Sequence, residues 1–156
     1  MATAKVNCFI PAPIQRVFEL ITDHGHYDQF DSVAMSRLLK EGSINRNGLG
    51  AIRELKVASI RFIEEISVYD APSRFEYRVL ECYLCIGNHG REIGFPLVHQ
   101  KGQITLEEHD GGTTVYWMSQ FTLALPFGHQ IAKLMRPFVE RGFSQILQDC
   151  RTVLSI

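Results

Sequence analysis

Apolar and polar residues follow two different periods in the first part of the chain. Residues 5–10 alternate with the period of a strand, which Pro11 ends. Residues 14–21 repeat apolar side chains at helical spacing, and residues 23–30 continue as a second short helix or turn with Asp23 as its cap. The chain is therefore expected to open with one strand and two short helices.

Between residues 33 and 123 the pattern has the period of strands separated by turn residues. Ala58-Ser59 and Asp110-Gly111 are predicted to be tight two-residue hairpin turns. An Asp-Gly pair is typical of a type I′ turn, in which both residues have a positive φ. The glycine-rich residues 87–97 have no clear period. The predicted strands are 33–42, 50–57, 60–69, 73–86, 99–109 and 113–123.

The last predicted element is a long amphipathic helix over residues 128–154. Its apolar stripe is interrupted by Pro137, which should kink the helix, and by Gly142. Strands with short connections form an antiparallel sheet, and one amphipathic helix must bury its stripe against a face of that sheet. The pattern thus predicts an α+β helix-grip, a curved antiparallel sheet of about seven strands wrapped around the C-terminal helix.

The hairpin turns assign most apolar strand residues to one face of the sheet, because residues two apart share a face. Arg53 and Glu64 also fall on this face, opposite each other in mid-strand, and Glu81 falls there near a strand end. The first two are interpreted as a cross-strand ion pair, which is structural in a cavity wall, in contact with a ligand, or exposed at the rim. The apolar members of this face are Leu55, Val57, Phe62, Ile66, Val68, Phe75, Tyr77, Val79, Ile104, Leu106, Val115, Trp117 and Phe121.

Composition narrows the class of protein. The chain has 156 residues, the size of one domain, and its 46% hydrophobic and 21% charged residues argue against disorder. The formal net charge is −1, whereas a nucleic-acid binder usually has a basic excess. No apolar run approaches the roughly 18 residues of a membrane helix, and no secretory signal is evident. A soluble, cytoplasmic protein without a nucleic-acid partner is expected.

Few side chains in the sequence are candidates for metal binding, cofactor binding or catalysis. Cys82 and Cys85 form a C-x-x-C, but no second pair of ligands follows, so the cysteines are expected to be buried reduced thiols and no metal is expected. No phosphate loop, dinucleotide fingerprint or nucleophile elbow is present, and no cofactor is expected. Tyr77 and Tyr83 are either hydrogen-bond donors to a ligand carbonyl or satisfied core tyrosines.

The histidines give only weak candidates for acid or base chemistry. His24 and His26 are expected to lie on an exposed polar loop, because a turn does not fix their rings as a metal site requires. His89 and His99 flank the glycine-rich segment, where either acts as an acid or base only if a partner orients it. The catalytic residues, if any, are therefore unknown.

Several segments resemble the START-like, Bet v 1-like helix-grip superfamily. They are APIQRVFELITD, SRLLKEG, GAIRELKV, FIEEISVYDAPSRFEYRV, and GGTTVYWMSQFTL before a C-terminal helix. Within the superfamily they are similar to the polyketide cyclase/dehydrase and lipid-transport group, and to the branch that includes the plant abscisic acid receptors. Those receptors close a gate loop between the third and fourth strands. Here that connection is only Ala58-Ser59, so residues 87–97 are expected to form the lid instead.

The resemblance implies a large apolar cavity between the sheet and the long helix. A carrier for a small hydrophobic ligand, a lipid or polyketide-like molecule, is favoured over a cyclase/dehydratase-type enzyme, because few polar groups converge. A partner-binding module with a filled core and a homodimer stay open. An anionic head group is expected to bind Arg53 and to compete with Glu64 for it. The expected ligand-binding residues are Arg53, Leu55, Phe62, Glu64, Ile66, Tyr77, Val79, Trp117, Ile131, Met135 and Phe138.

Overall fold

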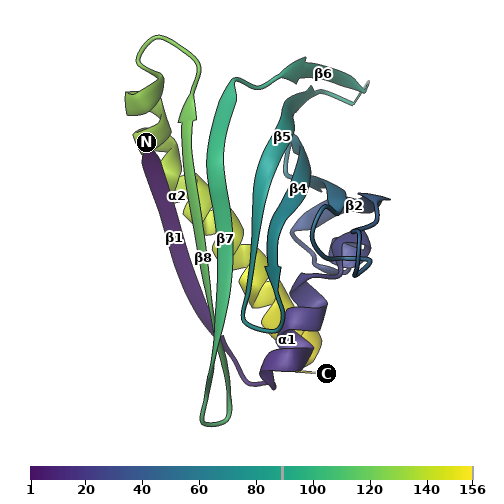
Figure 1. Cartoon of the computed structure of the whole chain (residues 1–156). Helices are drawn as coiled ribbons and strands as arrows, with labels where there is room; N and C mark the ends of the chain where they lie inside the picture. The colour runs from purple at the N-terminus through teal and green to yellow at the C-terminus, as the bar shows by residue number, and fades with distance from the viewer. Residues whose placement is uncertain (89, 156) are drawn as a thin grey trace.

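The structure, a computed structural model that describes residues 1–88 and 90–155, consists of one curved sheet with a long helix across one face (Figure 1). The predicted α+β helix-grip is confirmed, with eight strands in the sheet instead of about seven. The strands are β1 (Ala2–Ile10), β2 (Val33–Lys40), β3 (Ile52–Val57), β4 (Ile60–Asp70), β5 (Arg74–Ile86), β6 (Arg91–Gly94), β7 (Leu97–His109) and β8 (Gly112–Leu123). The helices are α1 (Ile14–Ile21), the 3-10 helix η1 (His24–Gln29) and α2 (Gly128–Leu154).

Neighbouring strands are antiparallel in the order β1-β8-β7-β5-β4-β3-β2. The central strands β5 and β7 pair only where residues 74–77 meet residues 102–105, and above that point β5 pairs with β6 instead. Figure 1 shows β5 and β7 diverging toward this upper end of the sheet. The predicted lid is therefore partly regular structure, since residues 91–94 extend the sheet as β6.

Small side chains bring α2 close to one half of the sheet. Ala132 of α2 packs with Ala2 and Ala4 of β1 and with Phe121 of β8. Farther along α2, the Phe143 ring stacks on Trp117 of β8 with a centroid distance of 4.1 Å and an interplanar angle of 6°. The helix has the predicted bounds and its residues stay helical through Pro137. Part of its apolar stripe is thus buried against β1 and β8, at one side of the concave face.

Both predicted hairpin turns are confirmed, and so is the pairing that they imply. Arg53 lies opposite Glu64, with Ala58 and Ser59 joining β3 to β4. Only Gly111 of the Asp110-Gly111 turn has a positive φ, 84°, so the prediction of a type I′ turn is wrong. Ala58 has the positive φ in the other turn, 53°, which is a strained conformation for a residue with a Cβ.

Two bulges change which residues face the core. An extra residue at Ser67 of β4 places Tyr69, instead of the predicted Val68, opposite Phe75. A second extra residue, in β5 between the pairs of Val79 and Glu81, moves Glu81 to the outer face. Each bulge shifts the alternation by one residue, which periodicity counted from the turns does not detect.

Candidate functional site

Arg53 and Glu64 form a buried ion pair at the centre of the concave face. Nε of Arg53 donates to Oε1 of Glu64 over 2.8 Å, and their side chains are only 1% and 7% exposed. Burial raises the pKa of Glu64, and the positive charge of Arg53 offsets part of that rise. The pair is therefore desolvated, which excludes the alternative of an ion pair exposed at the rim and leaves the structural pair and the ligand contact open.

Three aromatic rings surround the Arg53 guanidinium. Its Cζ lies 5.1 Å from the ring centroids of Tyr27 and Tyr77, and 5.9 Å from that of Phe75. Burial favours a lower pKa for Arg53, but Glu64 and the tyrosines raise it above its ordinary value. A guanidinium suits this environment, because it is planar and more weakly hydrated than an ammonium.

His24 closes the ring of contacts around Arg53. Its side chain is fully buried, with an exposed fraction of 0%, so the prediction of an exposed loop is wrong for this residue. Nε2 lies 2.9 Å from the Asn47 carbonyl oxygen, which can only accept, so Nε2 carries the proton. Nδ1 is then free to accept from a guanidinium nitrogen of Arg53 over 3.1 Å. Burial, and next the charge of Arg53, lower the pKa of His24 to about 3, so the ring is neutral.

A second polar group spans the point where β5 and β7 diverge. The Val79 N–H donates to Nδ1 of His99 over 3.1 Å, so Nε2 of this ring donates to Oγ of Ser119 over 3.0 Å. Burial lowers the pKa of His99 to about 4. The ring therefore replaces strand pairing that is absent here, and both of its nitrogens are occupied.

Tyr77 fills the space beside His99. The rings stack with centroids 5.5 Å apart at an angle of 15°, and Nε1 of Trp117 donates to the Tyr77 hydroxyl over 2.8 Å. Tyr77 crosses directly over Gly102, where a Cβ would overlap with its ring. This glycine lies inside β7, and a glycine in a strand interior is a sequence signal for such a close approach.

Two positions on α2 have few or no side chains packed against them. Phe138 of α2 is 76% exposed, and no heavy atom lies within 4 Å of the position that a Cβ on Gly142 would take. Asp149 lies eleven residues, or about three turns, after Phe138 and so points the same way. Its carboxylate accepts from the N–H of Ser32, between η1 and β2, over 3.0 Å. Phe138 therefore lies on the same side of α2 as Asp149, which meets the η1–β2 connection.

The predicted ligand-binding residues divide into a buried and an accessible group. Arg53, Leu55, Glu64, Ile66, Tyr77 and Trp117 are buried, whereas Phe62, Val79, Ile131 and Met135 are partly exposed and Phe138 is exposed. Tyr83 belongs to neither group, since its hydroxyl bonds Glu81 on the outer face. His26 is exposed as predicted and bonds Asp23, and His89 lies outside the described residues. The role of these residues in ligand binding stays a prediction.

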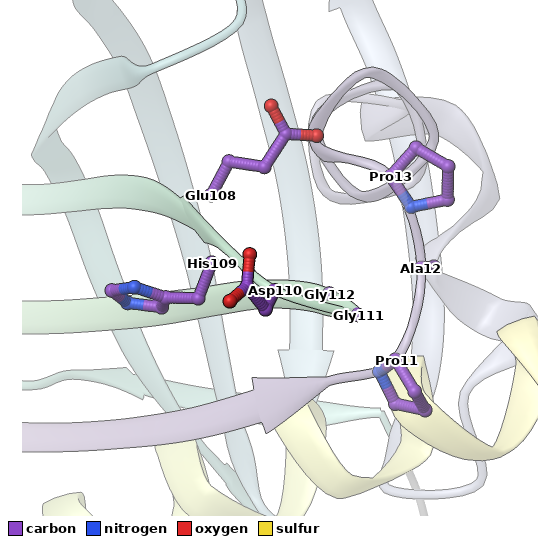
Figure 2. Close-up of a pocket in the computed structure, with 8 residues that line it drawn as sticks. All are labelled: Pro11, Ala12, Pro13, Glu108, His109, Asp110, Gly111 and Gly112. Carbon is purple, nitrogen blue, oxygen red and sulfur yellow. The ribbon is translucent and has the colours of Figure 1, made fainter.

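Two hollows on the protein surface lie away from the predicted ligand-binding residues. One of about 650 Å³ lies where the β7–β8 turn meets the β1–α1 connection, and Figure 2 shows Glu108 and His109 pointing in different directions there. Another, of about 360 Å³, lies at the outer face beside Lys56, Arg61 and Arg91. None of the predicted ligand-binding residues lines either hollow. The predicted cavity against α2 therefore also stays a prediction.

The cysteines show no linked pair in the described part of the chain. Cys8, Cys82 and Cys150 are free and buried, as expected, whereas Cys85 is only partly buried. In residues 1–88 and 90–155, no three His, Cys, Asp or Glu side chains are grouped so as to hold a metal ion. No helix in that part of the chain is long and apolar enough to cross a membrane.

A family model described as polyketide cyclase / dehydrase and lipid transport matches residues 1–155 of the chain. The chain belongs to this family. The family agrees with the helix-grip fold and with a hydrophobic-ligand-binding function for that fold, but the narrower resemblance to the abscisic acid receptors is not confirmed. A comparison of the chain with curated proteins found no match.

Solved structures with the same fold share little sequence with this family member. A protein from Thermus thermophilus is 18% identical with a TM-score of 0.74, covering 97% of this chain and 95% of its own. A START superfamily protein from Mycobacterium smegmatis is 11% identical with a TM-score of 0.74, covering 97% and 98%. DynU16, a protein in the dynemicin biosynthetic locus, is 18% identical with a TM-score of 0.62, covering 98% and 47%. At these identities the likeness supports the fold alone.

Proposed function

We propose that this protein binds a small hydrophobic ligand, a lipid or polyketide-like molecule, between α2 and the concave face of the sheet. The exposure of Phe138 carries this proposal, because a phenylalanine that is 76% exposed leaves a large apolar surface in water. Phe62, Val79 and Ile131 are partly exposed on the concave side or its helix. A ligand lying there would cover these side chains together.

Binding is favoured over catalysis by the state of the histidines. His24 and His99, whose pKa values are lowered to about 3 and about 4, are neutral at physiological pH. Each uses both ring nitrogens in contacts with other parts of the protein. A general acid or base needs a pKa near the working pH and an available nitrogen. These two rings instead hold the fold around the site, which supports a carrier in place of a cyclase or dehydratase.

The first test is native mass spectrometry of the purified protein, which should show an additional mass that organic solvent extracts as a lipid or polyketide-like compound. The second test measures the dissociation constant of that compound for Phe138→Asp. Loss of one buried phenylalanine contact is worth about 1.5–3 kcal/mol, so binding should weaken roughly 10- to 100-fold.

Ile44→Asp provides the matched control, since Ile44 is 89% exposed and lies in the β2–β3 connection away from α2. This variant should bind as the unchanged protein does. Equal affinity for both variants and the unchanged protein would contradict binding beside α2. Conversion of the compound to a new product would favour the enzyme.

A further inference from the structure

One oxygen of the buried Glu64 carboxylate has no hydrogen-bond partner among residues 1–88 and 90–155. Oε1 accepts from Arg53, but no hydrogen bond to Oε2 is found from the described residues. Among these residues, no buried side-chain oxygen or nitrogen lacks a partner. Oε2 must therefore belong to the 7% of the Glu64 side chain that solvent can reach.

The accessible oxygen lies at the inner end of the apolar surface. Glu64 pairs with Val79 across β4 and β5, and Phe62 lies two residues before it on the same face of β4. Both neighbours are partly exposed, whereas Arg53 on the other side is almost completely covered. A molecule that enters along Phe62 and Val79 therefore meets a hydrogen-bond acceptor before it reaches the guanidinium.

The charges around this oxygen favour a neutral partner. Arg53 and Glu64 form an ion pair over 2.8 Å whose two charges cancel. The remaining titratable neighbours are neutral, so the group sums to zero; they are His24, Tyr27, Tyr77 and Cys82. A ligand carboxylate would place a second negative charge beside Glu64. A ligand ammonium would place a second positive charge beside Arg53. Both are costly where water is largely excluded.

We propose that Glu64 selects a ligand with a neutral hydroxyl group, which donates its hydrogen to Oε2. The inference rests on the proposed function, because the apolar part of the same ligand would lie on Phe62, Val79 and Phe138. It replaces the sequence-based expectation of an anionic head group at Arg53. That side chain is 1% exposed and already bound to Glu64 and His24.

The test compares four probes of equal chain length by isothermal titration calorimetry at neutral pH: octanol, its methyl ether, octanoate and octylamine. The ether has the alkyl chain and the oxygen of the alcohol, with a methyl group in place of the hydrogen that the alcohol can donate. Octanol should bind roughly tenfold more tightly than each of the other three, the fold-change that corresponds to one hydrogen bond to a charged group.

Two double variants test whether the preference for octanol over its ether depends on Glu64. Arg53→Met with Glu64→Leu removes the acceptor and leaves no unpaired buried charge, so the preference for octanol over the ether should disappear. Arg78→Met with Glu65→Leu is the matched control, since this ion pair also includes a glutamate of β4 but joins it to β5 on the outer face, with a distance of 2.7 Å. The control should keep the tenfold preference. If the first double variant does not fold, the affinities of the four probes for the unchanged protein still test whether a hydroxyl group is preferred.

The outcomes separate this inference from the proposed function. Octanol binding no more tightly than its ether to the unchanged protein would overturn the role of Glu64 and leave hydrophobic binding intact. Octanoate binding as tightly as octanol would overturn it in favour of Arg53 as the recognised charge. If none of the four probes binds, the proposed function itself fails.

Discussion

Protonation of His24 should govern the acid stability of this protein. The neutral ring accepts a hydrogen bond from Arg53 and donates one to the Asn47 carbonyl. A protonated ring cannot accept from Arg53 and would place two positive charges 3.1 Å apart in the core. Lowering the pH should therefore break the buried hydrogen bond between Arg53 and His24.

The magnitude follows from the difference in pKa between the two states. The pKa of His24 is lowered from 6.5 to about 3 in the folded protein, so the unfolded chain takes up the proton first as the pH falls. This contribution to stability is complete above the unfolded pKa and is lost between about pH 6.5 and pH 3. At pH 5 the loss from His24 alone is about 2 kcal/mol. His99, with a pKa of about 4 through burial, contributes in the same direction.

The assay is urea unfolding followed by the fluorescence of Trp117, the single tryptophan of the chain, at pH 7 and pH 5. His24→Gln keeps one acceptor for Arg53 and one donor for Asn47 but does not titrate. Its free energy of unfolding should fall by about 2 kcal/mol less than that of the unchanged protein between the two pH values. His129→Gln, at an exposed position of α2, is the control and should behave as the unchanged protein.

An unchanged pH dependence in His24→Gln would refute this reasoning. It would mean that His24 has the same pKa in the folded and unfolded states, and hence that the ring is not held between Arg53 and Asn47. A lower stability of the variant at pH 7 alone would not refute it, because loss of ring packing affects both pH values equally.

Two further predictions concern close contacts in the fold. Gly102→Ala should lower the free energy of unfolding by about 1–3 kcal/mol, because its Cβ displaces the Tyr77 ring, whereas Gly94→Ala, with no atom within 4 Å, should not; urea unfolding measures both. Asp149→Leu should cost about 1–3 kcal/mol in the same assay, because the Ser32 N–H and hydroxyl lose their shared acceptor, and an unchanged midpoint would show that α2 is not fixed to this connection.

The periodic spacing of apolar residues in the sequence was sufficient to predict most of the fold. Helical spacing predicted α2 with its observed bounds, and the two-residue turn at Ala58-Ser59 was enough to align Arg53 with Glu64. Such features are local, since each depends on neighbours along one strand, turn or helix. The errors at Val68 and Glu81 arose at bulges, where one extra residue reverses the alternation without a distinctive residue type.

The tertiary structure alone decided which polar residues form the candidate site. His24 belongs to a polar turn in the sequence pattern, yet the fold buries it against Arg53, 29 residues away along the chain. His99 bonds Val79 and Ser119 only because β5 and β7 diverge at that point. A single sequence contains no record of such long-range contacts, because they depend on how strands distant in the chain come together. The sequence by itself therefore determined the helix-grip and its ion pair, and packing determined that a neutral histidine and three aromatic rings enclose that pair.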